Sequence, residues 1–410
     1  MPSSYNSASN RGAGMRELFL HLDQFLTQTQ PLWRFESFHL SGQTHTPWTD
    51  SHQDLQRWLV SLSEHQIEQF KASPATLLPQ LGKFIEGLEN IHHSLQLPSA
   101  SCQVLDTAAI ETGIPGRKLE QIRLLGGAAI TCHQGQEWLE WCSGKGYLGR
   151  VLASATGQKV TSFEFQHALC ESGQSDADAL GLPMQFVQGD AFDEQSRCCL
   201  SSVQHAIALH ACGDLHVRLM QYATDASLQA ISFSPCCYHL VQSDRYQCLS
   251  QLAQASALSL TRQELRIPLQ ETVTGGERVR RHRFAEMSYR LGFDELLRAE
   301  LGLMEYLPIP SIKKSQLSEG FVAFCQWAAQ QKGIELPNVD YTRFQHCGEQ
   351  RFWAMERLSL VQSGFRRLLE LWLVLDKAMY LEERGYQVTL SEFCKRDVTP
   401  RNILVHACKQ

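Results

Sequence analysis

A loop that contains two glycines is the first feature of this sequence that could hold a ligand. Gly144 and Gly146 close the segment 140–146, which follows an apolar run and precedes a helix-like one. Glycine lets the backbone turn tightly and approach a ligand without an intervening Cβ. Unpaired amides at the start of the next helix can then face polar ligand atoms. The loop alone is equally consistent with an ordinary strand-to-helix turn.

Two acidic residues at later strand ends favour a nucleoside as that ligand. Glu164 follows the loop at about the spacing at which a carboxylate accepts the hydroxyls of a ribose in dinucleotide sites. Asp190 follows a third apolar run and could accept a hydrogen bond from the exocyclic amine of adenine. Either residue alone could be a solvent-facing carboxylate or a turn residue. Because the three features end successive strand candidates, we interpret them together as a nucleoside site.

An alternation of short strands and helices must position these residues. The strand candidates are residues 137–141, 159–163, 184–187, 205–209 and 229–233. The helices between them are expected to begin near Gly146, Gln166, Asp214 and Ser243. This order predicts right-handed crossovers and a mostly parallel sheet.

The whole chain is predicted to be a doubly wound α/β protein with helical additions. A long helix at 351–384 and two final strands, 386–393 and 402–407, would complete a seven-stranded sheet. Residues 274–310 are expected to form an irregular insertion. The predicted organisation is an N-terminal helical domain at 1–98, a first core part at 99–270, an insertion with a basic cluster at 271–350 and a closing core part at 351–410.

Four motifs in this core resemble class I S-adenosylmethionine-dependent methyltransferases. Residues 140–148 resemble the first motif, 208–215 the fourth-strand motif, 235–239 the fifth-strand motif and 397–402 the loop between the last two strands. The chain most resembles a subgroup that contains methyltransferase-like proteins and the methyltransferase half of glutathione S-transferase C-terminal-domain-containing protein. The resemblance covers about residues 106–256 and the final strand pair.

The resemblance implies S-adenosylmethionine as the cofactor. Glu140, where Asp is commoner in the family, would fix the methionine amino group directly or through water. Glu164 would bind the ribose, and Asp190 with Ala191 would border adenine. The implied cofactor-binding residues are Glu140, Cys142, Ser143, Gly144, Lys145, Gly146, Glu164, Asp190, Ala191 and His210. Arg117 and Lys118 resemble a lysine pair that precedes the first motif in the family.

Methyl transfer from a sulfonium is an in-line displacement, so alignment of the reacting atoms can supply much of the rate. A base is needed only if the acceptor must lose a proton. His210 and His239, each just beyond a strand candidate, could position or deprotonate the acceptor. Cys237 and Tyr238 are further catalytic candidates beside them. The same residues could instead only line the cofactor pocket.

No metal site is predicted, although the chain contains 14 cysteines. It lacks the two matched Cys-x-x-Cys pairs typical of structural zinc sites. Cys236, Cys237 and His239 would need a fourth ligand, and adjacent cysteines do not easily serve one tetrahedral ion. We therefore interpret the cysteines as buried or site thiols in a reducing compartment.

The acceptor is less defined by the sequence than the cofactor. A net charge of −6 argues against a surface that binds nucleic acid generally. The cluster Arg278, Arg280, Arg281 and Arg283 could nevertheless contact phosphates, or simply be a solvated basic segment. RNA (tRNA or rRNA) is slightly favoured over a protein acceptor, partly because the motif near His210 also resembles the eukaryotic tRNA acceptor-stem ribose methyltransferase.

Two other functional classes stay open. A methyltransferase-like fold can serve as a cofactor-binding scaffold or interaction module without turnover. A nicotinamide-dependent oxidoreductase is disfavoured because the loop lacks the three-glycine spacing of pyrophosphate sites. The longest apolar stretch, 368–375, is too short for a bilayer and contains Glu370, and the N-terminus lacks the pattern of a secretory signal. A cytoplasmic location is expected, with no membrane contact and no obligate partner.

Overall fold

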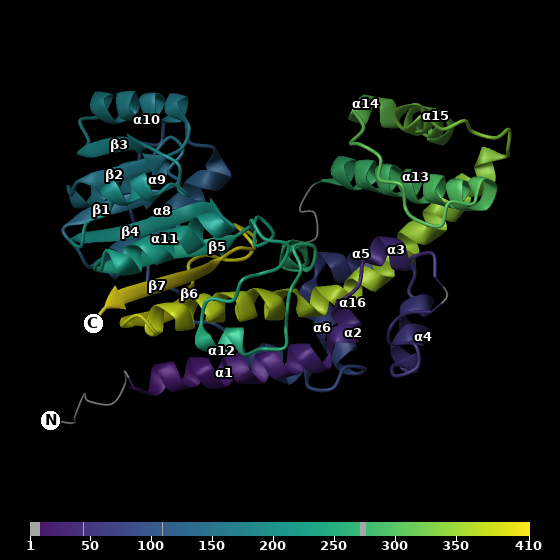
Figure 1. Cartoon of the computed structure of the whole chain (residues 1–410), viewed down its shortest axis with the longest axis horizontal. Helices are drawn as coiled ribbons and strands as arrows, with labels where there is room; N and C mark the ends of the chain where they lie inside the picture. The colour runs from purple at the N-terminus through teal and green to yellow at the C-terminus, as the bar shows by residue number, and fades with distance from the viewer. Residues whose placement is uncertain (1–8, 44, 109, 271–275) are drawn as a thin grey trace. The chain divides into compact units, whose positions relative to one another are not determined.

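A seven-stranded sheet with strand order β3-β2-β1-β4-β5-β7-β6 forms the core of the protein (Figure 1). The computed structural model describes residues 9–43, 45–108, 110–270 and 276–410. Five parallel strands precede an antiparallel pair. They are β1 (Glu137–Trp141), β2 (Val160–Glu164), β3 (Met184–Gln188), β4 (Gln204–Cys212), β5 (Ala230–Cys236), β6 (Tyr386–Glu392) and β7 (Ile403–Lys409). The predicted doubly wound, mostly parallel fold is confirmed.

Helices connect most of the parallel strands as right-handed crossovers require. These are α9 (Tyr147–Thr156), α10 (His167–Ala179) and α11 (Asp214–Asp225), with a 3₁₀ turn at Glu194–Cys199 between β3 and β4, and α8 (Gly116–Thr131) precedes β1. The strand order reverses between β1 and β4, which are hydrogen-bonded neighbours. In open α/β sheets, ligands bind outside the carboxyl ends of the strands at such a switch point. A ligand site is therefore expected at the loops that follow β1, β2, β4 and β5.

Buried apolar side chains explain why α8 and α9 pack on the sheet. Leu125 and Leu148, from these two helices, belong to one cluster with Trp138 of β1, Val160 of β2 and Ile207 of β4. Each of these five side chains is at most 3% exposed. Strands that helices cover on both faces have nearly continuous apolar sequences, and this pattern allowed them to be predicted.

The prediction of a helix near Ser243 is wrong. The next helix, α12, spans only Gln251–Gln254. A tertiary contact holds the preceding segment in an irregular conformation, because the carboxylate of Asp376 accepts hydrogen bonds from the amides of Leu249 and Ser250 at 3.0 and 2.7 Å. A second 3₁₀ turn follows at Glu264–Leu269.

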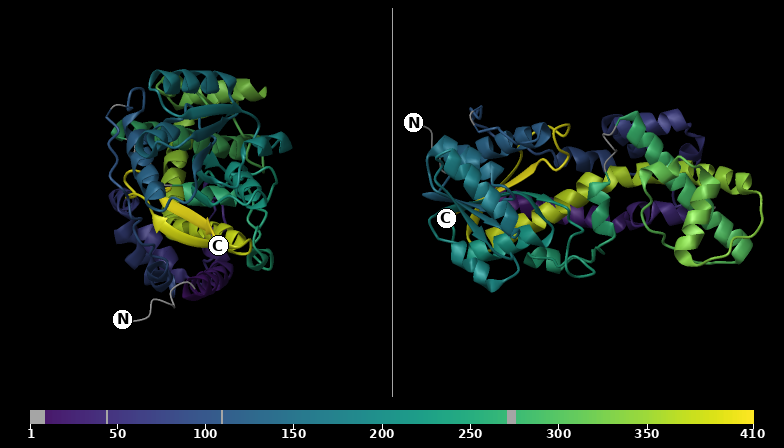
Figure 2. Two further views of the ribbon diagram at one scale, coloured as in Figure 1. Left: turned by 90° about the vertical axis from the view of Figure 1, so that its left-hand side faces the viewer. Right: turned by 90° about the horizontal axis from the view of Figure 1, so that it is seen from above.

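The chain divides into two compact units. Unit 1 comprises Met1–Gln28, His92–Leu269 and Leu368–Gln410, and unit 2 comprises Thr29–Ile91 and Gln270–Arg367. Unit 1 contains the sheet, the helices on it and an N-terminal helix. Two further views in Figure 2 show the yellow β6–β7 pair within the sheet.

Unit 2 is built from helices. They are α2 (Gln30–Trp33), α3 (Ser37–Leu40), α4 (Gln53–Ser61), α5 (Glu64–Ala72), α6 (Pro74–Gly82), α13 (Glu277–Leu301), α14 (Lys314–Leu317), α15 (Phe321–Lys332) and the first part of α16 (Tyr341–Glu382). Helix α7 (Leu88–Ser94) spans the boundary in sequence between the units, and α1 (Ser9–Gln28) belongs to unit 1. No helix in the described ranges is both long and apolar enough to cross a membrane.

The prediction of an irregular segment at 274–310 is wrong over most of its length, because α13 is a 25-residue helix. The helix contains ion pairs between residues one turn apart, Glu286 with Arg290 and Asp294 with Arg298, each at 3.0 Å. Such pairs stabilise a helix whose sequence shows little apolar periodicity. The first two residues of the predicted insertion, 274 and 275, lie outside the described residues.

Candidate functional site

The loop after β1 has the open, left-handed backbone that its glycines suggested. Cys142, Gly144 and Gly146 have φ angles of +56°, +60° and +69°. A Cβ on Gly146 would lie 2.4 Å from Cζ of Phe186, so only glycine fits at that position. A Cβ on Gly144 would meet nothing within 4 Å. One side of the loop is therefore packed on the protein, and the other has room for a ligand.

An unpaired polar atom lies in the same loop. Ser143 is 8% exposed, and its buried Oγ has no hydrogen-bond partner among the described residues. A buried hydroxyl without a partner costs free energy, so its presence next to open space favours a polar ligand at this position. Lys145 is half-buried in this loop.

Glu164 lies at the end of β2 and is bound to this loop. Its Oε2 accepts a hydrogen bond from the amide of Gly144 at 2.9 Å, and its Oε1 accepts one from the amide of Gln166 at 3.0 Å. Each carboxylate oxygen can accept a second hydrogen bond. The side chain is thus held in place and retains acceptor capacity for the hydroxyls of a ligand.

Glu140 is buried between β1 and the start of α9. Its Oε2 accepts a hydrogen bond from Oγ of Ser162 at 2.9 Å. Burial raises the pKa of Glu140 to about 7, although Ser162, the amide of Gly149 and the charge of Lys118 act in the opposite direction. A ligand ammonium group nearby would favour the charged carboxylate still further.

The loop after β3 contains Asp190 and Ala191, the two residues predicted to border adenine. Asp190 is exposed, and its Oδ1 accepts a hydrogen bond from the amide of Phe192 at 2.9 Å. This is the turn role that the sequence left open. Ala191 is buried, whereas Phe192 is 36% exposed. The second Asp190 oxygen accepts no hydrogen bond recorded among the described residues.

A β-bulge displaces His210 at the end of β4. Leu209 pairs with Ser234 and Cys212 with Cys236, so two residues of β4 face one residue of β5. His210 has a φ of +71°, and bulges of this kind redirect side chains next to active sites. Desolvation and the charges of Lys118 and Arg401 lower the pKa of His210. The lowered pKa keeps the imidazole neutral at neutral pH.

The segment after β5 places Cys237 and His239 at the neighbouring strand end. Cys237 has a φ of +47°, and its carbonyl accepts a hydrogen bond from the amide of Leu240 at 2.9 Å. Hydrogen bonding from Cys236 lowers the pKa of the Cys237 thiol, although burial opposes it. Burial, aided by the charge of Arg266, lowers the pKa of His239. His210 thus lies within the last residues of β4, not beyond its end as expected, whereas Cys237 and His239 follow the end of the neighbouring β5.

Tyr238 is placed differently from its neighbours. Its side chain is 3% exposed, and the single proton of its hydroxyl is within reach of two acceptors, the carbonyl of Pro235 at 3.4 Å and Oε1 of Glu370 of α16 at 3.5 Å. These contacts lie in the interior of unit 1, and they account for Tyr238 without a catalytic role.

The arginine cluster lies on α13 in unit 2. Arg278, Arg280 and Arg281 are exposed, but Arg283 pairs with the buried Glu356 at 2.6 Å. Burial raises the pKa of Glu356, yet the charges of Arg283 and Lys71 outweigh it and hold that pKa below its ordinary value. Arg283 therefore has a structural role in neutralising a buried carboxylate.

Two positive residues near the strand ends received little or no weight from the sequence. The charge of Lys118, in α8, lowers the pKa of both Glu140 and His210. The charge of Arg401 lowers the pKa of both His210 and Cys237. The carbonyl of Arg401 accepts a hydrogen bond from Oγ of Ser234 at 2.9 Å, which fixes the β6–β7 loop beside β5. The motif at 397–402 was the only sign of Arg401, because no spacing rule links residues so far apart in sequence.

Comparison with known proteins agrees with this geometry. Residues 117–244 match a family model described as a methyltransferase domain. This segment contains the loop after β1, Glu164, Asp190, His210 and the three residues after β5. This part of the chain is therefore similar to a methyltransferase domain.

Several solved structures resemble parts of the chain at low identity. The tRNA (uracil-54, C5)-methyltransferase of Pyrococcus abyssi, in complex with S-adenosyl-L-homocysteine, is 20% identical over 28% of this chain and 28% of that chain, with a TM-score of 0.25. Geranyl diphosphate methyltransferase, in complex with GPP and sinefungin, is 15% identical over 45% and 65%, with a TM-score of 0.25. The bifunctional kinase-methyltransferase WbdD is 16% identical over 36% and 34%, with a TM-score of 0.24. The chain spans less than two thirds of the length of each.

Proposed function

We propose that this protein transfers a methyl group from S-adenosylmethionine to an acceptor. The observation that carries the proposal is the loop after β1, where the buried Ser143 Oγ adjoins open space at Gly144 and the anchored carboxylate of Glu164 and has no hydrogen-bond partner in the described part of the chain. A nucleoside cofactor would supply hydrogen-bonding groups for both side chains. The residues present therefore fit the cofactor that the family match implies.

Each of these residues would bind a different part of the cofactor. S-adenosylmethionine, when bound, supplies an electrophilic methyl group on sulfur. Glu140 would hold the ammonium group, Glu164 the ribose, and Asp190 with Ala191 the adenine. His210 borders the same strand ends with a neutral imidazole, which could orient the acceptor or take its proton.

Calorimetric titration with S-adenosylmethionine tests the cofactor site. Wild-type protein is expected to bind saturably, and Glu164→Gln to bind about 10–100-fold more weakly, because an amide NH₂ replaces one acceptor of a charged hydrogen bond. Asp190→Asn should cause a smaller loss. Glu171→Gln, an exposed glutamate on α10, is the matched control and should bind as wild type does. Absence of binding by well-folded wild-type protein would contradict the proposal and favour a scaffold without turnover.

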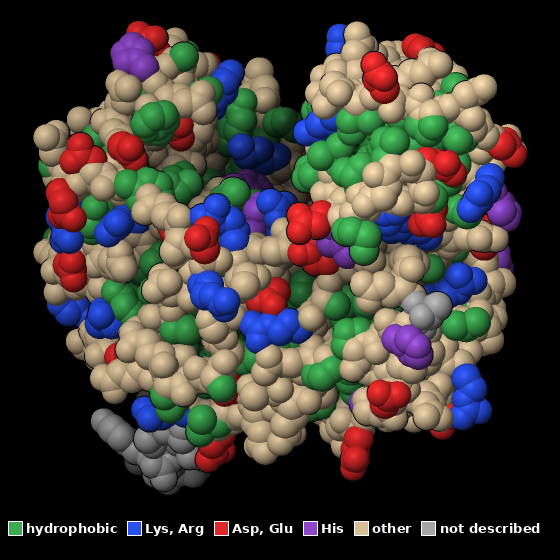
Figure 3. All heavy atoms as spheres, turned by 45° about the vertical axis from the view of Figure 1, so that its right-hand side comes forward, with side chains coloured by type: hydrophobic (Ala, Val, Ile, Leu, Met, Phe, Trp, Pro, Cys, Tyr) green, Lys and Arg blue, Asp and Glu red, His purple; other side chains and the backbone are tan. Residues whose placement is uncertain are grey.

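We further propose membership of the methyltransferase-like subgroup and an RNA acceptor. Support for RNA comes from Arg278, Arg280 and Arg281, which are exposed within one turn of α13. Acidic and basic side chains are interspersed on the face drawn in Figure 3, so any phosphate binding would have to be local. Arg283 is omitted because it neutralises Glu356.

Replacing Arg278, Arg280 and Arg281 together by Gln tests this acceptor class. The variant is expected to bind single-stranded RNA more weakly, with a slope of log K against log salt reduced by about 2, since each phosphate contact contributes about 0.7. Filter binding across a salt series measures the slope. Replacing Lys313, Lys314 and Lys332 by Gln removes the same charge from exposed positions of unit 2 and should leave the slope unchanged. Equal slopes for both triple variants would favour a protein or small-molecule acceptor.

A further inference from the structure

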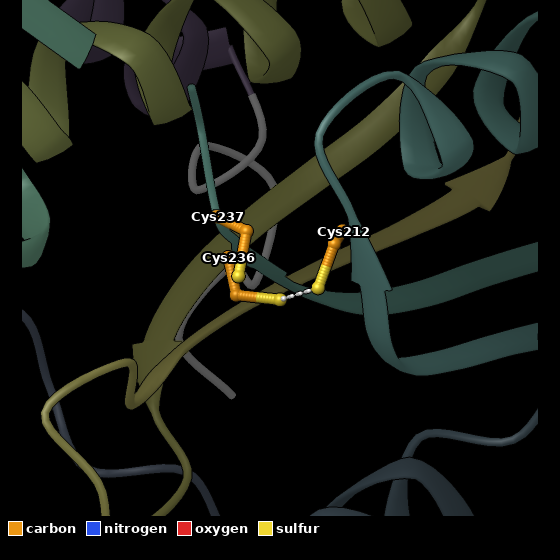
Figure 4. A group of neighbouring side chains, drawn as sticks. All are labelled: Cys212, Cys236 and Cys237. Carbon is orange, nitrogen blue, oxygen red and sulfur yellow. Dashed lines mark hydrogen bonds between the residues drawn. The ribbon is translucent and has the colours of Figure 1, made fainter. Parts of the chain in front are cut away.

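Three cysteine side chains converge where β4 and β5 end (Figure 4). The Sγ atoms of Cys212, Cys236 and Cys237 all lie within 4.8 Å of one another, and those of Cys212 and Cys236 are 3.3 Å apart. Cys236 is buried, and the other two are half-buried. The group is thus sheltered from solvent without being sealed in the core.

The backbone brings these thiols together in two ways. The bulge at His210 sets Cys212 directly beside Cys236 across the two parallel strands. The left-handed conformation of Cys237 then turns the chain, so that the side chains of two consecutive residues approach the same point instead of pointing to opposite faces. Adjacent cysteines do not easily serve one tetrahedral ion when their side chains point apart, and this turn removes that difficulty.

The spacing suits a soft metal ion. Zinc binds thiolates at about 2.3 Å in tetrahedral geometry, which places ligand sulfurs about 3.8 Å apart. The Cys212–Cys236 separation of 3.3 Å is close to this value and the other separations do not exceed 4.8 Å, so small side-chain rotations would suffice. Among the described residues, no histidine, cysteine or carboxylate lies within 4.8 Å of all three sulfurs as a fourth ligand. Zinc sites with three protein ligands keep one position open for water or substrate.

We propose that Cys212, Cys236 and Cys237 bind one zinc ion as three thiolates and leave its fourth position open. The site adjoins His210 at the switch-point edge of the sheet, so a fourth ligand could be water or a heteroatom of the acceptor. This inference concerns metal binding alone and does not depend on binding of S-adenosylmethionine.

Metal analysis of the full-length protein tests the proposal. Protein purified without chelators is expected to contain about one zinc per chain. Cys212→Ser, Cys236→Ser and Cys237→Ser should each lose that zinc, whereas Cys394→Ser, at a half-buried thiol outside the group, should retain it. Circular dichroism would verify that each variant is folded.

A second measurement uses the wild-type chain and so does not depend on how the variants fold. After chelation, added Co²⁺ should produce visible and thiolate charge-transfer absorption that one equivalent of Zn²⁺ abolishes. A reduced wild-type protein that takes up neither ion would overturn the proposal. Zinc content that is equal in Cys237→Ser and Cys394→Ser would also do so, as would a Cys212–Cys236 disulfide in a chain that binds no zinc after reduction.

Discussion

Replacing Asp376 with Ala is expected to lower the free energy of unfolding by about 3–5 kcal/mol, as removal of one partner from a buried charged network does. Asp376 lies in α16 and is fully buried. Its carboxylate accepts hydrogen bonds from the hydroxyl of Tyr246 at 2.7 Å and from the amide and hydroxyl of Ser250, both at 2.7 Å. The variant leaves these donors unpaired and leaves buried Lys377 without its neighbouring carboxylate. Denaturant unfolding followed by circular dichroism measures the change.

Two other variants distinguish the loss of stability caused by breaking this hydrogen-bond network from that caused by removing any carboxylate. Asp376→Asn keeps the shape and one acceptor oxygen, so its loss should be smaller than that of the Ala variant. Asp225→Ala removes a half-exposed aspartate of α11 and should change stability by no more than about 0.5 kcal/mol. An Asp376→Ala protein with the midpoint and slope of wild type would show that the loop before α12 does not depend on this carboxylate.

The strands of this fold were predictable, but the residues that end them were less so. Apolar runs located β1 to β5, yet β4 and β5 each continue three residues beyond their predicted ends, to Cys212 and Cys236. The continuation contains His210 and Pro235, which interrupt an apolar strand pattern. Proline lacks a backbone donor and is tolerated within a sheet at bulges, and Pro235 lies opposite the bulge in β4. The residues that the sequence pattern excluded from β4 and β5 thus include His210, Cys212 and Cys236.

Tertiary contacts explain the other differences between sequence and structure. The residues after Ser243 have a helix-like pattern, but Asp376, more than a hundred positions later, binds their amides instead. Helix α13 has weak apolar periodicity, but Asp294 also pairs with Arg351 of α16 at 2.8 Å. No local pattern could reveal either partner. The glycine loop was predictable because its backbone conformation is a local property of Gly144 and Gly146.

Backbone strain identifies the same edge of the sheet independently of any motif. Among the described residues, four that are not glycine have positive φ angles: Cys142, His210, Ser227 and Cys237. Cys142 and Cys237 directly follow β1 and β5, and His210 lies two residues before the end of β4, so all three are at the carboxyl edge. Such conformations cost of order 1–3 kcal/mol each and persist where the surrounding structure enforces them, often at functional sites. The strain coincides with the loop, the bulge and the thiol group described above.

Buried histidines at the other end of the sheet should make the stability of unit 1 sensitive to acid. Oγ of Ser232 in β5 lies 2.9 Å from Nε2 of His205 and 2.8 Å from Nδ1 of His406. Nδ1 of His205 lies 3.0 Å from Nδ1 of His133. Burial lowers the pKa of His406 from 6.5 to about 4, and burial with the charges of His406 and His133 lowers that of His205 well below 6.5. These rings are therefore neutral in the folded protein.

Lowering the pH from 6.5 to 4 is expected to remove about 3 kcal/mol of stability through His406 alone, at about 1.4 kcal/mol per unit of pKa difference. The unfolded chain takes up a proton in this range while the folded ring does not, so stability is present above pH 6.5 and falls as the pH drops toward 4. Because carboxylates titrate in the same range, the measurement is the difference in unfolding free energy between wild type and His406→Gln, obtained by urea titration at each pH. That difference should shrink by up to about 3 kcal/mol on acidification, whereas the difference between wild type and His167→Gln, an exposed histidine of α10, should stay constant. A wild-type minus His406→Gln difference that is the same at pH 7 and pH 4 would show that the ring of His406 is protonated equally in the folded and unfolded states.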